Sequence, residues 1–186
     1  MDTVRRASNP AAVRIAALFA VVAATVAGAA HAGATPPRHP AVALTPLELG
    51  VVADINSLRA QHHLATLTVS PALTEAARSH SQEMETDGYF AHDSYDGTTF
   101  WKRIARYYPS TGSGYWSVGE NLLWSSPGVD AQHALTMWLD SPEHRKNMLD
   151  PNWREIGISA VHDDDAPGVY NGLAVTIVTT DFGVRK

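Results

Sequence analysis

The sequence contains no cysteine. This absence excludes disulfide bonds and a lipid anchor attached through cysteine, so the fold must be held together by its hydrophobic core. It also excludes the small secreted domains that depend on several disulfides for stability. Basic residues are few as well: 14 Lys and Arg stand against 19 Asp and Glu, for a formal net charge of −5, and the basic residues form no cluster along the sequence. We therefore expect neither nucleic acid nor an anionic membrane surface as a partner.

Apolar runs long enough to cross a membrane are also lacking beyond the N-terminal region. That region begins with arginines, continues with an uncharged Ala/Val-rich run at 15–30 and ends with Ala30-His31-Ala32. A basic start, a short apolar run and an A-x-A site predict a secretory signal peptide, residues 1–32. An uncleaved N-terminal anchor is the alternative, but the run is short for a bilayer span. We expect a secreted protein with no transmembrane segment after cleavage.

The remaining chain is long enough for one domain with a single core. Residues 33–44 contain three prolines among small residues and predict a flexible tether. The domain is predicted to span residues 45–186, and we expect it to be a monomer.

Helix signals fill the first two thirds of this domain. Thr45 and Glu48 form a capping box around Pro46, which predicts a helix ending near His62-His63. Apolar spacing and cap residues predict four more helices, beginning at Ser70, Thr98, near Asp130 and at Ser141. Four histidines on the predicted helices are expected to be helix-end, hydrogen-bonded core or surface residues and not ligands: His62, His63, His80 and His133.

The last third has the pattern of strands. Residues 156–160 alternate like a strand with one buried face, and 173–180 are almost entirely β-branched or apolar, as in a strand covered on both faces. The acidic stretch 163–168 between them predicts a solvated hairpin loop. Helices followed by antiparallel strands predict an α+β fold, a three-layer α-β-α sandwich with an antiparallel sheet.

One carboxylate stands out within the helical part. Glu120 lies in Gly119-Glu120-Asn121 just before an apolar pair, and we interpret this sequence as a tight turn that leaves Glu120 partly buried. A buried carboxylate is costly unless it is paired, hydrogen-bonded or bound to a cation. The expected partners are Arg103, Arg145 or a histidine.

Two histidines are candidates for the same site. His144 would be the third residue of the helix capped by Ser141, where the helix dipole favours the neutral imidazole that ligates a metal or accepts a proton. His92 follows an aromatic stretch in a predicted loop. With Glu120, these histidines could bind a divalent metal and leave coordination positions open, but a hydrogen-bonded structural cluster is equally consistent with the residue types.

Several ordered motifs resemble the bacterial branch of the CAP superfamily, which includes cysteine-rich secretory proteins, venom allergens and plant pathogenesis-related proteins. The resemblance runs from about Leu47 to Gly183. The motifs that carry it are His92, Gly119-Glu120-Asn121, Trp138 with Ser141–Leu149, Glu155–Ile158 and Thr180–Gly183. It implies an α-β-α sandwich, in agreement with the pattern of helices and strands.

The resemblance also implies a central cleft. By motif, His92, Glu120 and His144 match three of the family's four cleft residues, which in some members bind zinc or another divalent cation. The position of the family's second glutamate holds Ser141, so that glutamate is missing, and Asp140 or Glu143 is the alternative carboxylate that could replace it. Four neighbours are expected to support the three cleft residues: Asn121, Ser141, Glu143 and Arg145.

These observations predict a secreted, extracellular or cell-wall-associated binding module whose His/Glu cleft recognises a lipid, sterol, cell-wall or protein ligand. One alternative is a metal- or histidine-assisted hydrolase, although no nucleophile stands out, because the hydroxyl of Ser141 is expected to cap a helix. A further alternative is a structural extracellular domain in which the cluster only ties loops together. We favour the non-enzymatic binding module.

Overall fold

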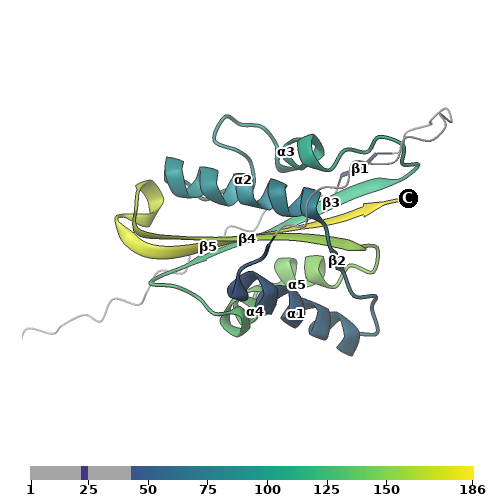
Figure 1. The fold of residues 1–186 in the computed structure, drawn as a ribbon, viewed down its shortest axis with the longest axis horizontal. Helices are drawn as coiled ribbons and strands as arrows, with labels where there is room; N and C mark the ends of the chain where they lie inside the picture. The colour runs from purple at the N-terminus through teal and green to yellow at the C-terminus, as the bar shows by residue number, and fades with distance from the viewer. Residues whose placement is uncertain (1–21, 25–42) are drawn as a thin grey trace, which may run out of the picture.

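The computed structural model describes residues 22–24 and 43–186 (Figure 1). Most of the predicted signal peptide, 1–32, and of the predicted tether, 33–44, therefore lies outside the described residues. The first helix, α1 (Pro46–Gln61), begins at the predicted capping box. Thr45 accepts a hydrogen bond from the backbone of Glu48, and the Glu48 carboxylate accepts one from the backbone of Thr45.

A five-stranded sheet forms the centre of the molecule, in the order β1-β3-β5-β4-β2. Its three long strands are antiparallel: β3 (Trp116–Ser125), β4 (Glu155–Ala166) and β5 (Leu173–Arg185). The short strand β1 (Val22–Ala24) pairs antiparallel with β3. The short strand β2 (Thr68–Val69) pairs parallel with β4, so the sheet is antiparallel in its long strands and mixed as a whole.

Helices cover both faces of this sheet. The helices α2 (Pro71–Asp87) and α3 (Phe100–Tyr107) lie on one face, and α1, α4 (Ala131–Leu139) and α5 (Pro142–Met148) lie on the other (Figure 1). The predicted α-β-α sandwich is confirmed. One core cluster, which includes Ile55 and Trp138, packs beneath the sheet, and two smaller clusters lie on the α2 side.

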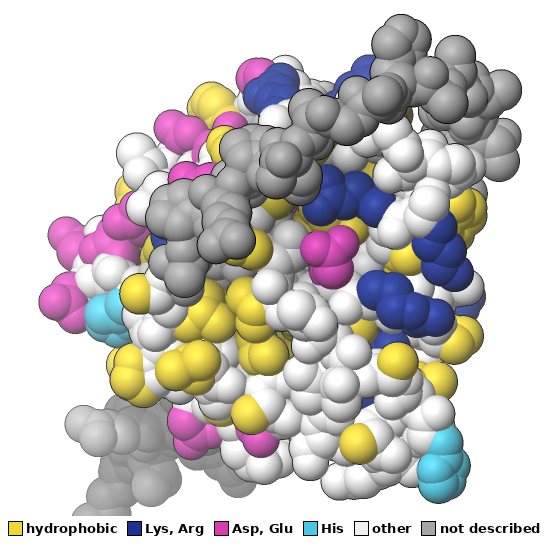
Figure 2. Space-filling model, turned by 45° about the vertical axis from the view of Figure 1, so that its right-hand side comes forward, with side chains coloured by type: hydrophobic (Ala, Val, Ile, Leu, Met, Phe, Trp, Pro, Cys, Tyr) yellow, Lys and Arg dark blue, Asp and Glu magenta, His cyan; other side chains and the backbone are white. Residues whose placement is uncertain are grey.

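The surface carries its charges unevenly on the face that Figure 2 shows. Lys and Arg side chains gather toward the right of this view, whereas most of the acidic side chains lie toward the left, and a group of hydrophobic side chains lies nearer the acidic side (Figure 2). Basic residues that are scattered along the sequence therefore come closer together in the fold.

The acidic stretch does not form the predicted hairpin loop. Strand β4 continues through the aspartates to Ala166, with a register shift between Asp163 and Ala166. The chain reverses afterwards, through a 3-10 turn (Gly168–Tyr170) and the left-handed residues Asn171 and Gly172. The prediction was wrong because Asp163 and Ala166 still pair with β5, and the exposed Asp164 and Asp165 lie in the register shift between them.

Two charged residues of α1 are buried, although they lie off its apolar stripe. The guanidinium of Arg59 is fully buried and donates hydrogen bonds to the carbonyls of Met148 (2.7 Å) and Asp150 (3.0 Å) at the end of α5. On the same helix, Glu48 accepts a hydrogen bond from the backbone of Ala160 in β4 (2.9 Å). Polar side chains thus fix α1 to the sheet and to the helix that carries His144.

Candidate functional site

Glu120 lies in the middle of β3 and not in a turn. The glycine before it serves close packing: a Cβ atom at Gly119 would lie 2.7 Å from Oδ1 of Asn147 and 2.9 Å from the ring of Trp153. Because Gly and Asn are frequent in turns, the sequence suggested a turn where the structure has a strand that touches its neighbours closely.

Both carboxylate oxygens of Glu120 have partners. One oxygen pairs with Nη2 of Arg103 on α3, and the other lies 2.8 Å from Nδ1 of His92. Of the two arginines expected as partners, Arg103 therefore makes the ion pair, whereas Arg145 is exposed. Burial is the largest single influence and raises the pKa of Glu120, but Arg103, His80 and His92 together outweigh it and hold the pKa at about 2. Glu120 is ionised and charge-balanced.

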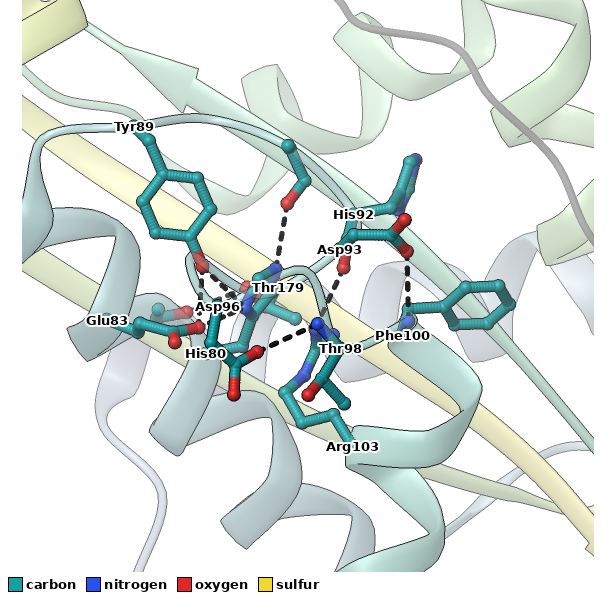
Figure 3. A network of polar contacts seen from close by, with 12 residues as sticks. His80, Glu83, Tyr89, His92, Asp93, Asp96, Thr98, Phe100, Arg103 and Thr179 are labelled. Atoms are coloured by element: carbon teal, nitrogen blue, oxygen red, sulfur yellow. Dashed lines mark hydrogen bonds and ion pairs between the residues drawn. The ribbon is translucent and has the colours of Figure 1, made fainter.

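His92 lies in the loop between α2 and α3, and two buried side chains hold its backbone (Figure 3). Nη1 of Arg103 donates to the carbonyl of His92 (2.8 Å), and Nε2 of His80 donates to the carbonyl of Ala91 (2.9 Å). His80 is thus the hydrogen-bonded core histidine that the sequence predicts. Arg103 orders both the carboxylate and the histidine of the cluster.

The partners of His80 extend this network toward the surface. The hydroxyl of Tyr89 donates to Glu83 (2.6 Å) and lies 3.4 Å from Nδ1 of His80 (Figure 3).

Beyond His92, Asp93 accepts a hydrogen bond from the backbone of Phe100 (3.1 Å). Helix α3 therefore begins at Phe100, two residues after the predicted start, because the preceding residues belong to this hydrogen-bonded loop.

His144 approaches from the opposite layer, on α5, and is buried. Burial, reinforced by repulsion from His92, lowers its pKa to about 4, so the ring is neutral at physiological pH. Asparagines fasten α5 to β3. Asn121 donates to the carbonyl of His144 (3.1 Å), and Asn147 donates to the carbonyl of Glu120 (3.1 Å) and to Oδ1 of Asn121 (2.9 Å).

Three other predicted neighbours play smaller parts. Ser141 is buried at the start of α5, but its side chain makes no capping hydrogen bond, contrary to expectation. Glu143 and Arg145 are exposed, and within the described part of the chain neither makes an ion pair with Glu120. Of the four expected supporting residues, Asn121 is the one whose hydrogen bonds join the site elements.

The sequence analysis missed Asp181 as a member of the site. This residue lies directly opposite Glu120 in the β3–β5 pairing and is fully buried. Burial and the negative charge of Glu120 raise the pKa of Asp181 well above its usual value, which favours the neutral carboxyl group. A lone acidic residue in a strand otherwise rich in β-branched and apolar residues was the available signal.

The cluster fits a divalent metal poorly. The oxygens of Glu120 are engaged by Arg103 and His92, and a cation placed there would face the guanidinium charge. Among residues 22–24 and 43–186, no three His, Cys, Asp or Glu side chains are gathered in a metal-binding arrangement. The ion pair and the hydrogen bond thus occupy the oxygen atoms that a metal would need.

The family model described as "Cysteine-rich secretory protein family" (CAP) matches residues 52–180, which include all three predicted cleft residues. The chain belongs to the CAP family. The uncharacterized protein YkwD of Bacillus subtilis is 32% identical to this CAP domain over 115 residues, which cover 61% of the chain and 42% of that protein. The chain thus spans less than half the length of this relative.

Solved structures share the fold. An extracellular protein containing a SCP domain from Bacillus anthracis is 29% identical, with a TM-score of 0.55 over 78% of this chain and 45% of that one. An outer surface protein from Borrelia burgdorferi is 22% identical, with a TM-score of 0.56 over 73% of this chain and 90% of that one. No helix in the described part of the CAP domain is long and apolar enough to span a membrane.

Proposed function

We propose that this CAP domain is an extracellular binding module whose ligand contacts His92. The side chain of His92 is 12% exposed, whereas that of Glu120 is 1% exposed and His144 is buried. Two structural neighbours are described as an outer surface protein and an extracellular protein, and the N-terminal sequence has the features of a signal peptide. These observations support an exported protein whose cluster meets its ligand at His92.

The single observation that carries this proposal is the orientation of the His92 ring. Its Nδ1 faces a carboxylate that Arg103 helps to keep ionised. Nδ1 therefore carries a hydrogen and donates a hydrogen bond to Glu120. No described residue forms a hydrogen bond with Nε2, so this nitrogen is available to a ligand. A fixed imidazole nitrogen suits the hydroxyl groups of a sterol, a lipid headgroup or a wall glycan, or a polar group of a protein ligand.

A hydrolase is the second candidate, because Ser141 is buried at the start of the helix that carries His144 and its side chain does not cap that helix. Glu120 is a weak base at a pKa of about 2, so the base would have to be a histidine. Hydrolysis that persists unchanged in both His92→Ala and His144→Ala would show that these histidines do not act as the base. Ser141→Ala tests the nucleophile directly.

The binding proposal is tested by co-sedimentation of the purified protein with sterol-containing phosphatidylcholine vesicles and with isolated peptidoglycan. We expect saturable binding to one probe and a loss of at least about tenfold in affinity for His92→Ala. His133→Ala, which changes an exposed histidine of α4, is the matched control and should bind like the wild type. Equal affinities of the His92→Ala and His133→Ala variants, or no binding to either probe, would overturn the proposal.

Calorimetric titration with zinc and magnesium addresses the divalent cation that the resemblance implies. Because Arg103 and His92 engage Glu120, we expect no saturable heat from a site at these residues. A binding heat that disappears in both His92→Ala and His144→Ala would show that the cluster opens to admit a metal.

A further inference from the structure

Among the described residues, one short strand pairs with the outer edge of β3. On its inner side β3 pairs with β5 from Trp116 to Ser125, but on its outer side it pairs with β1 only from Trp116 to Val118. The residues of β1, Val22–Ala24, lie inside the predicted signal peptide. Cleavage after residue 32 would therefore remove the strand that covers this edge.

Backbone geometry shows which groups face this edge. The backbones of Tyr115 and Lys186 exchange two hydrogen bonds of 3.0 Å, so the N–H and C=O of Tyr115 point toward β5. Because these directions alternate along a strand, the backbone groups of Trp116 and Val118 point outward, as do those of Glu120 and Leu122. Removal of β1 leaves two outward N–H groups and two outward carbonyls at Trp116 and Val118.

Side chains close the edge beyond that point. The outward carbonyl of Glu120 accepts a hydrogen bond from Asn147 (3.1 Å), and that of Leu122 accepts one from the indole of Trp138 (3.1 Å). Both contacts are buried, so a strand added to β3 has to stop at Val118. The open edge is thus a defined three-residue site, which ends two residues before Glu120.

This site lacks the charged residues, prolines and bulges that usually prevent an edge strand from pairing with another chain. Residues 116–118 contain no charge and no proline, their pairing with β5 shows no bulge, and both Trp116 and Val118 are buried. We propose that the Trp116–Val118 edge of β3 is a strand-addition site, which binds an extended segment of another polypeptide antiparallel to β3 when residues 1–32 are absent. Main-chain hydrogen bonds give affinity in this mode of recognition.

The segment paired with this edge in the full chain indicates the chemistry of the partner. It is Val-Ala-Ala, which is small, uncharged and free of proline. The predicted tether fits worse, since Pro36, Pro37 and Pro40 lack the N–H groups that such pairing uses. We therefore assign the site to an extended segment of small apolar residues.

The test uses residues 33–186, which contain all the described core residues. A labelled peptide with the sequence of residues 18–27 and a lysine tail for solubility is titrated by fluorescence anisotropy. A matched peptide carries Val22→Pro and Ala23→Pro, because one of two consecutive N–H groups must face β3. We expect saturable binding of the first peptide and affinity lower by at least about tenfold for the second.

Amide hydrogen exchange locates the bound peptide. We expect slower exchange at Trp116 and Val118, and binding weaker by at least about tenfold to the full chain, in which β1 occupies the edge. Equal affinity for the two peptides, or protection confined to other strands, would overturn the inference. A stable dimer of residues 33–186 in sedimentation, with the same amides protected, would also contradict it, because a second copy would then occupy the edge.

Discussion

The Arg103–Glu120 ion pair is surrounded by titratable groups whose pKa values are shifted toward their neutral forms. Burial lowers the pKa of His80 and of His144, and burial together with the charge of Glu120 raises the pKa of Asp181. The opposite charges of Arg103 and Glu120 compensate each other in this interior. Such a pair gives limited net stability, but removing one partner leaves an uncompensated charge.

Arg103→Met should accordingly lower the free energy of unfolding by about 3–5 kcal/mol, because it leaves Glu120 ionised and buried without its cation. Urea unfolding followed by circular dichroism measures this loss. Arg106→Met, an exposed change on the same helix, is the control and should have little effect. The double variant Arg103→Met/Glu120→Gln should recover part of the loss, and equal stability of Arg103→Met and Arg106→Met would refute the role of the pair.

His144 should make stability depend on pH. Its folded pKa of about 4 lies below the ordinary value of 6.5, so the unfolded chain binds the proton more readily. The stability that His144 contributes is therefore fully present above about pH 6.5 and is lost as the pH falls toward 4, by up to about 3 kcal/mol. Urea unfolding at pH 7.5 and pH 4.5 should show a smaller decrease for His144→Gln than for the wild type. An unchanged pH dependence in that variant would contradict the assignment.

At the scale of the elements, the site depends on how closely α5 approaches β3. Gly119 leaves room for Asn147 and Trp153, and the indole of Trp153 donates to the carbonyl of Asn147 (3.0 Å). The helix that carries His144 is thereby held against the strand that carries Glu120. The site therefore depends on this close contact between β3 and α5, a helix of only seven residues.

Gly119→Ala should therefore destabilise the protein by about 1–3 kcal/mol, because the new methyl group would overlap Asn147 and Trp153. Thermal unfolding measures the change. Gly114→Ala is the control, since its Cβ atom would meet no described atom closer than 3.7 Å. A melting temperature as low for Gly114→Ala as for Gly119→Ala would show that general loss of glycine flexibility, and not this contact, is responsible.

The elements also show where sequence reasoning succeeds. Cap residues and apolar spacing predicted the helices because these signals are local, as at Thr45 and Glu48. The surroundings of Glu120 were harder to predict. Its need for a charged partner pointed to Arg103, but the strand around it and its neighbour Asp181 depend on pairing between distant segments, which no local pattern reveals.

For the whole molecule, the core is self-contained without disulfides. The described residues of the three core clusters lie between Leu44 and Val184. We expect residues 43–186 to unfold in one cooperative thermal transition, since removal of residues 1–42 deletes only β1 from the described fold. Circular dichroism with and without reductant should give the same melting temperature because the sequence has no cysteine. A broad, non-cooperative transition would show that the N-terminal residues are part of the folding unit.

The position of β5 in the sheet has a consequence for biosynthesis. Strand β5 lies between β3 and β4, yet the ribosome makes it after both of them. A nascent chain that ends before Leu173 contains β3 and β4 but lacks β5, which pairs with both of them. The complete sheet therefore cannot form at that stage of synthesis, and it forms only after β5 has been synthesised.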